Sequence, residues 1–150
     1  MEWTETQAIK AHCEELVLNF AVLNDTRRYD EVAQLFAPDG VFYRPLAPQK
    51  AVQGRAAIVE DLRRKPPNLH TIHVCTNILV TVLGSTQARG ISYFTVYLHE
   101  EEPDAPWPQA LKGTVYVGQY EDDFALVEGR WCIQTRRGTN RFYLQQGAKA

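Results

Sequence analysis

Hydrophobic residues recur every three or four positions near the start of the chain. The positions with this spacing are Ile9, Cys13, Leu16, Val17, Phe20 and Leu23. This period is typical of a helix with one buried face, and it predicts a helix from about residue 4 to residue 25. A short second helix is expected next, with Asp30 near its start and Val32, Leu35 and Phe36 on its apolar side. A third helix is expected between Gly54 and Pro66-Pro67.

The remainder of the chain has the composition and alternation of strands. Pro38-Asp39-Gly40 predicts a turn, with a first strand over residues 40–46. Longer strands are predicted at 69–83, 87–99, 111–127 and from 130 to about 143, with hairpin connections at Gly84-Ser85 and Glu128-Gly129. The acidic segment 100–108 has no periodicity and is expected to be a solvated linker, from which Trp107 could reach the rim of a pocket.

Helices followed by hairpin-connected strands predict an α+β fold. Long strands twist and coil, so we expect a cone-like, strongly curved antiparallel sheet with the three N-terminal helices over its concave face. Such an arrangement leaves a cavity between the helices and the sheet, which is a common place for a ligand site.

Composition limits the classes of partner. The 150 residues suit a single domain over 1–150, and the 16 basic and 18 acidic residues give a net charge of −2. The basic residues are scattered, which argues against nucleic acid as a partner. No signal peptide and no apolar run of roughly 20 residues are visible, so a soluble, cytoplasmic protein without a membrane partner is expected. Cys13, Cys75 and Cys132 are widely spaced and are expected to be free thiols.

Two histidines lie three positions apart in the predicted strand at 69–83. Alternation places His73 on the same face as Asn77 and His70 on the opposite face. A polar face of this kind fits either a pocket wall or a surface buried between subunits, and a bulge would change the parity. His70 is expected at a rim or at the surface, and His12 and His99 are expected at the surface.

Four motifs occur in the same order as in a known group of proteins. They are LNDTRRYDEVAQLFAPDGVFY, HVCTN, GISYFTVY and VGQYEDDFALVEGRWCIQTR, within about residues 9–142. Together they resemble the SnoaL-like branch of the nuclear transport factor 2-like superfamily, which implies the cone-shaped α+β fold. The same scaffold hosts dehydratases, isomerases, polyketide cyclases, small subunits of ring-hydroxylating dioxygenases and proteins without known chemistry, so the resemblance alone selects no reaction.

The resemblance implies an acid–base pair. In dehydratases and isomerases of this superfamily, an acidic residue at the end of the first helix faces a histidine on the third strand, and these positions match Asp25 and His73. His73 would remove a proton beside a carbonyl and return it to a leaving hydroxyl. From the residues alone, Asp25 could instead bond nearby backbone groups at the helix end, and His73 could be a structural histidine.

Further residues are expected to surround a substrate. Some active dehydratases have a tyrosine where this chain has Phe20, so one phenol is absent. The tyrosines on the strands could replace it or simply fill the cone, and Arg136 could bind a carboxylate or pair with Asp122. The expected substrate-binding residues are Phe20, Tyr43, Asn77, Tyr93, Tyr120 and Arg136.

Two classes of function follow. The first, towards which the resemblance leans, is a cofactor-independent lyase or isomerase of dehydratase or cyclase type that acts on a small, apolar, ring-containing substrate. The second is a non-catalytic module, either a small-ligand-binding protein or the small structural subunit of a dioxygenase-type assembly, which the missing hydroxyl at Phe20 favours. No phosphate-binding loop or metal-ligand cluster is visible, so neither a cofactor nor a metal is expected.

The strands also predict self-association. Segments 87–99 and 111–127 carry apolar residues at both parities, although three helices can cover only one face of the sheet. We therefore expect the outer face to be covered by another copy of the chain, in a homodimer or a larger homo-oligomer.

Overall fold

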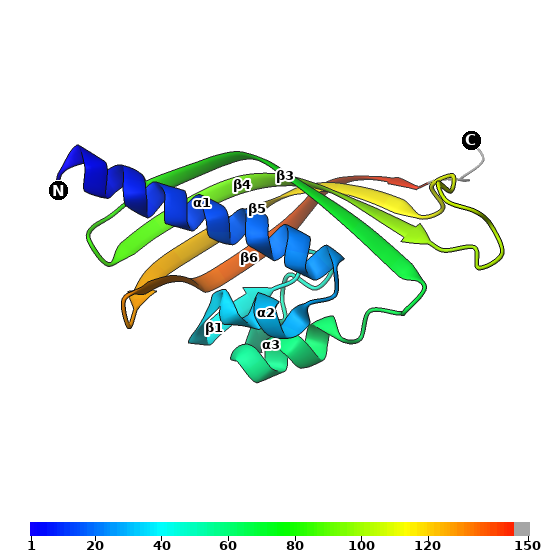
Figure 1. Ribbon diagram of the computed structural model, residues 1–150, viewed down its shortest axis with the longest axis horizontal. Helices are drawn as coiled ribbons and strands as arrows, with labels where there is room; N and C mark the ends of the chain where they lie inside the picture. Colours follow the sequence, from blue (N-terminus) through cyan, green and yellow to red (C-terminus); the bar gives the residue numbers. More distant parts are fainter. Residues whose placement is uncertain (146–150) are drawn as a thin grey trace.

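The computed structural model describes residues 1–145 and contains three helices and one sheet (Figure 1). The helices are α1 (Trp3–Asp25), α2 (Tyr29–Gln34) and α3 (Arg55–Leu62). The strands are β1 (Phe36–Tyr43), β2 (Ala51–Gln53), β3 (Leu69–Val82), β4 (Gln87–Glu100), β5 (Thr114–Val127) and β6 (Arg130–Gln145). Within residues 1–145, no helix is both long enough and apolar enough to cross a membrane.

The sheet has the strand order β2-β1-β6-β5-β4-β3 and is curved and open. The long strands β3 to β6 follow one another through antiparallel pairing, and β1 then pairs in parallel with β6. The β1–β6 pair is the exception to the antiparallel sheet that the sequence predicts. Figure 1 shows α1 running across one face of the sheet, with α2 and α3 beside its C-terminal end. The sheet thus has a face covered by helices and an outer face.

The apolar side of α1 packs on the sheet as its spacing predicts. Phe20 is fully buried, and its ring meets those of Phe36, Phe42 and Tyr120 edge-on at centroid distances of 6.2, 5.5 and 5.8 Å. Aromatic side chains bury the most area per residue, so this cluster is the centre of the core. The buried residues of α1 are Ile9, Cys13, Leu16, Val17, Phe20, Ala21 and Asn24. As predicted, Cys13, Cys75 and Cys132 are free thiols.

The second helix and the first strand differ from the prediction. The helix ends at Gln34, and the strand begins at Phe36 rather than at residue 40. The Leu35 carbonyl accepts a hydrogen bond from the Ile133 N–H at 2.8 Å, so pairing with β6 overrides the helical spacing here. Pro38-Asp39-Gly40 is an irregularity inside β1 rather than a turn before it. The short strand β2 was not expected.

A bulge at Asn77 reverses which side of β3 faces the helices. Asn77 has a left-handed backbone with φ of 52°, and the register with β4 shifts between Thr76 and Leu79. Before the bulge, Thr71 and His73 lie on the covered side; after it, Val80 does, and Asn77 itself is exposed. The prediction that Asn77 shares a face with His73 is therefore wrong.

The left-handed backbone at position 77 gives a stability test. Asn77→Val should lower the free energy of unfolding by about 1–2 kcal/mol, because a β-branched residue adopts this conformation only with strain. Asn77→Gly should cause no such loss. Thr76→Val, at an exposed position of regular strand, is the matched control and should change stability little. Urea unfolding measures all three, and equal stability of Asn77→Val and Thr76→Val would contradict the argument.

Candidate active site

The end of α1 directs Asp25 towards the sheet. Arg27 has a left-handed backbone with φ of 57°, and its N–H donates to the Asn24 carbonyl at 3.1 Å. The Arg28 N–H donates to the Leu23 carbonyl at 2.9 Å. These two bonds form the Schellman arrangement that closes a helix. Asp25 is consequently the last residue of α1, and its side chain is free to reach β3.

The Asp25 carboxylate accepts three hydrogen bonds from β3. The Thr71 hydroxyl donates to Oδ1 at 2.9 Å, the His73 backbone N–H donates to Oδ2 at 2.7 Å, and His73 Nδ1 lies 2.5 Å from Oδ1. β3 is an edge strand, which leaves the His73 N–H free to bond a side chain. These contacts exclude the alternative in which Asp25 merely bonds the backbone at its own helix end.

This contact fixes the orientation of the His73 ring. Because a carboxylate can only accept, Nδ1 carries the proton that is shared with Asp25, and the neutral ring has its lone pair on Nε2. Nε2 makes no hydrogen bond to the described residues, 1–145, and His73 forms part of a cavity wall. The side chains of His73 and Asp25 are only 11% and 12% exposed. The pair is therefore largely shielded from solvent, and its histidine lies at the wall of the cavity.

The cavity lies between the helices and the covered face of the sheet and has a volume of about 220 Å³. Most of its wall is apolar, as is usual for sites that take small organic molecules. The apolar lining comprises Phe42, Pro45, Leu46, Leu62, Pro66, Leu69, Phe94, Val96, Leu98, Tyr116 and Tyr120, the two tyrosines included for their rings. The polar lining comprises Asn24, Arg44, Arg64, Lys65, Thr71, His73 and Asn140.

Lys65 lines the cavity, although no pattern in the sequence singles it out. It lies between α3 and β3, and its Nζ donates to Thr71 Oγ1 at 3.0 Å and to the Asn24 carbonyl at 3.4 Å. The Thr71 hydroxyl in turn donates to Asp25, so Lys65 is linked to Asp25 through Thr71. Thr71 could have been found, because it shares the strand parity of His73. Lys65 could not, because it lies in an irregular segment before two prolines.

Three of the expected substrate-binding residues lie at or behind the cavity wall. Tyr120 lines the cavity, and burial raises the pKa of its phenol, which is therefore neutral. Arg136 is fully buried and pairs with Asp122 through two contacts of 2.8 Å. Its guanidinium carbon lies 4.4 Å from the Phe20 ring centroid and 4.2 Å from that of Tyr120. Phe20 and Arg136 are thus packed behind the lining.

The other three expected residues lie away from the cavity. Asn77 is exposed because of the bulge, and Tyr93 is 51% exposed on the outer face. The parity of β4 turns Phe94, rather than Tyr93, towards the cavity. Tyr43 is half-buried, with the Arg137 guanidinium carbon 5.4 Å from its ring centroid.

The remaining histidines do not reach the cavity. His70 is exposed, as predicted, whereas His99 is only 8% exposed, so its predicted surface position is wrong. His99 Nδ1 accepts from the Lys112 N–H, and Nε2 bonds the Gln109 side-chain oxygen, each at 2.9 Å. The Trp107 ring packs edge-on against the rings of both His70 and His99, at centroid distances of 5.5 and 5.6 Å. Segment 100–108 is therefore anchored to the sheet and is more than a solvated linker.

Comparison with known proteins identifies the family. The family model for the SnoaL-like domain matches residues 6–137, most of the chain. The chain belongs to the SnoaL-like domain family. The resemblance in the motifs is thereby confirmed, as is the α+β fold with N-terminal helices on a curved, open sheet of the nuclear transport factor 2-like type. A comparison with curated proteins found no significant match.

Solved structures similar to this SnoaL-like protein share its fold at low sequence identity. A protein from Novosphingobium aromaticivorans assigned as a scytalone dehydratase is 19% identical, with a TM-score of 0.81 over 99% of this chain and 95% of that chain. A type 2 hexachlorocyclohexane dehydrochlorinase, LinA, is 13% identical, with a TM-score of 0.82 over 99% and 95%. A Catenulispora acidiphila protein in complex with S-DNPA is 20% identical, with a TM-score of 0.69 over 89% and 94%.

The burial of Lys65 makes a prediction about stability and pH. Burial, followed by repulsion from Arg27, lowers the pKa of Lys65 from 10.5 to about 8. The folded state therefore binds this proton more weakly than the unfolded state, and the cost to folding is fully present below the lower of these values. As pH rises from about 8 to 10.5, this cost disappears and stability increases.

Lys65→Met should flatten this rise, because the variant has no proton to lose at this position. Urea unfolding across the same pH range, and at neutral pH, measures the effect as the difference between variant and unaltered protein. Lys50→Met removes an exposed lysine and should leave the profile unchanged. Parallel profiles for Lys65→Met and the unaltered protein would contradict the prediction.

Proposed function

We propose that this SnoaL-like protein is a cofactor-independent lyase or isomerase that uses His73 as its acid–base group. The observation that carries the proposal is the contact between Asp25 and His73 at the wall of an open, largely apolar cavity. A histidine with a largely buried carboxylate on one ring nitrogen, and with no hydrogen bond to residues 1–145 on the other, has the arrangement of a general base.

The reaction begins with proton abstraction next to a carbonyl group. His73 Nε2 accepts the proton, and the charge that develops on the ring is stabilised by Asp25. The electron pair of the broken C–H bond forms an enolate. In a lyase, this pair then expels a β-hydroxyl group, to which His73 returns the proton so that water leaves. In an isomerase, His73 returns the proton to a different carbon atom.

The shape and lining of the cavity favour a small, largely apolar substrate that contains a ring. Its volume of about 220 Å³ is below the roughly 300–1,000 Å³ typical of sites for drug-sized ligands. Aromatic side chains from three strands, Phe42, Phe94 and Tyr116, offer ring faces and edges. The structural neighbours named as a scytalone dehydratase and a dehydrochlorinase agree with a lyase on this fold.

A non-catalytic module is the second candidate, and one observation favours it. Phe20 occupies a buried position where some dehydratases have a phenol, and its ring packs against Arg136 rather than facing the cavity. The binding of a small molecule without turnover, or co-purification with a large iron-containing dioxygenase subunit, would support this candidate.

Substitution of the pair tests the catalytic proposal. The assay uses a panel of cyclic and aryl ketones, with and without a β-hydroxyl group, in heavy water. The protein should exchange the α-hydrogens of some of these ketones for deuterium or should dehydrate those that carry a β-hydroxyl group. His73→Ala should reduce this rate by roughly 10²–10⁴-fold, the usual contribution of general acid–base catalysis. Asp25→Asn should also lose most of the rate, because it no longer fixes the ring tautomer. Mass spectrometry of the ketones measures both effects.

His70→Ala is the matched control, since it removes an exposed histidine of the same strand and should be nearly neutral. Asp25→Asn should also lower the free energy of unfolding by about 1–3 kcal/mol, since an amide cannot accept all three donors. Rates are therefore compared well below the melting temperature of each variant. A folded His73→Ala variant that reacts as fast as the unaltered protein would contradict the proposal.

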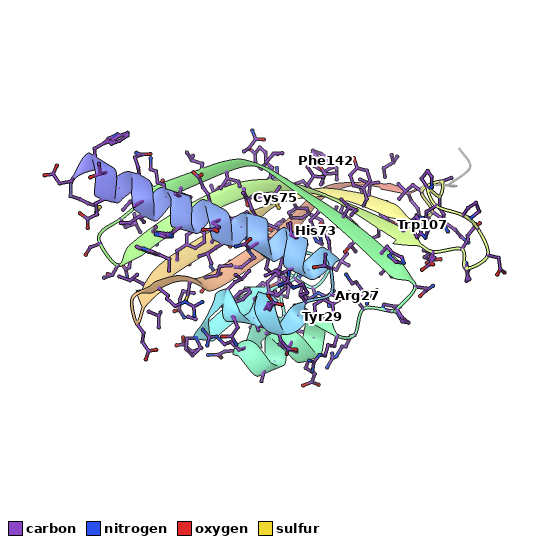
Figure 2. The ribbon with its side chains drawn as sticks, viewed as in Figure 1. Arg27, Tyr29, His73, Cys75, Trp107 and Phe142 are labelled. Atoms are coloured by element: carbon purple, nitrogen blue, oxygen red, sulfur yellow. The ribbon has the colours of Figure 1, made fainter. Side chains whose placement is uncertain are left out.

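The outer face of the sheet is proposed to bind another copy of the chain. Ile72, Val74 and Tyr97 are 59%, 44% and 41% exposed, and they lie together because Ile72 is paired with Tyr97 across β3 and β4. Figure 2 shows Phe142 of β6 on the side of the sheet opposite to the helices. The exposed apolar residues of this patch are Ile72, Val74, Ile91, Tyr93, Tyr97, Val117 and Phe142. A patch that spans four strands is typical of an interface between subunits.

Light scattering at micromolar concentration should give the mass of two or more chains. Ile72→Glu should shift the protein towards the mass of one chain, because a charge in the patch opposes burial. Val22→Glu is the matched control: Val22 is also 59% exposed but lies on α1, and its variant should keep the unaltered mass. A single-chain mass for the unaltered protein would contradict the proposal.

A further inference from the structure

Three cationic side chains line the cavity, and one of them has no carboxylate partner within the described part of the chain. Arg44 contacts Asp61 at 3.1 Å, and Arg64 contacts Glu60 at 3.5 Å. Lys65 forms no ion pair with any of the described residues, 1–145, and bonds only uncharged oxygen atoms. Its charge is consequently available to a molecule in the cavity.

The Lys65 ammonium group has three N–H donors, of which two are used in hydrogen bonds to the described residues. Of its three N–H bonds, one is directed to Thr71 Oγ1 and one to the Asn24 carbonyl. The Tyr29 ring centroid lies 5.7 Å from Nζ and accepts no conventional hydrogen bond. One N–H therefore remains for a ligand oxygen.

The backbone around Lys65 is held in place by Arg27. The Arg27 guanidinium donates to the carbonyl groups of Lys65 at 3.3 Å, Pro66 at 2.6 Å and Leu69 at 2.6 Å. Figure 2 shows Arg27 beside the end of α1, with His73 on the neighbouring strand. The segment that carries Lys65 is thus fixed to the same helix end as Asp25, which suits a group that must be positioned before the reaction begins.

Lys65 and His73 are joined through one hydrogen-bond network. Lys65 donates to Thr71, Thr71 donates to Asp25, and Asp25 accepts from His73. Both end groups line the same cavity, one as a cation and the other as a proton acceptor. A cation beside a base matches the charge of an enolate, whose negative oxygen forms as the base takes the proton.

We infer that Lys65 binds the carbonyl oxygen of the substrate and stabilises the enolate that forms when His73 removes the α-proton. The inference rests on the proposed function and narrows its substrate class to carbonyl compounds with a C–H bond next to the carbonyl. The C–H electron pair becomes the new carbon–carbon π bond, and the carbonyl π pair moves to oxygen. Lys65 stays protonated throughout and donates a hydrogen bond to the enolate oxygen.

Binding of an enolate mimic tests the inference without a known substrate. 4-Nitrophenol has a solution pKa near neutrality, its phenolate has a distinct absorbance, and nitrobenzene is the uncharged ligand of similar shape. At neutral pH, the unaltered protein should bind 4-nitrophenol as the phenolate and roughly ten- to a hundredfold more tightly than nitrobenzene. Lys65→Met should lose this preference but keep its affinity for nitrobenzene.

Lys50→Met is the control for a general loss of positive charge, and it should keep the preference. Should Lys65→Met fail to fold, as judged by circular dichroism, the measurement on the unaltered protein decides. Weaker or equal binding of 4-nitrophenol, or its binding in the neutral form, overturns the inference. An unaltered phenolate preference in folded Lys65→Met does so as well.

The two proposals can fail separately. If Lys65 confers the phenolate preference but no ketone exchanges deuterium, the oxyanion site stands and the catalytic proposal fails. If His73→Ala abolishes exchange while Lys65→Met binds phenolate like the unaltered protein, His73 is the base and Lys65 is not the oxyanion group. His73→Ala itself should retain the phenolate preference, because the phenolate oxygen is held by Lys65.

Discussion

The carboxylate of Asp25 is the contact on which the organisation of the covered face depends. It joins the last residue of α1 to the edge strand β3 through one hydroxyl, one backbone N–H and one imidazole. A buried charge is tolerated only when such donors surround it. The same bonds that satisfy the charge also orient His73 and hold the C-terminal end of α1 beside the cavity. Asp25 therefore both joins α1 to the sheet and orients the histidine.

Much of the fold could be predicted, because in a long segment the spacing of apolar residues indicates both the type of element and which of its faces is buried. The spacing from Ile9 to Phe20 predicts α1, and alternation predicts the four long strands to within a few residues. The prediction failed at Leu35 and Phe36, where a short apolar run fits a helix and a strand equally well. The partner that decides the outcome is Ile133, almost a hundred residues away along the chain. Local pattern carries no information about such a contact.

The site could be predicted only where parity and family motif agreed. Alternation separated His73 from His70 correctly because β3 is regular over that stretch, but it failed four residues later at the Asn77 bulge. Asp25 was found through the resemblance, and its three hydrogen bonds could not be read from its neighbours in the chain. Lys65 lies in an irregular segment whose position is set by the Arg27 side chain, so no periodic signal exists for it.

The parallel pairing of β1 with β6 has a consequence for the order of folding. β1 belongs to the first part of the chain, yet it pairs with β6, which is the last strand in the sequence. Contacts between such distant segments require the closure of a long loop, which slows folding. During synthesis, the edge of β1 stays unpaired until β6 has left the ribosome, whereas α1 can already pack on β3, its main partner in the sheet. The nascent chain therefore exposes an unpaired strand edge for most of its translation, and that edge is a segment that a chaperone could protect.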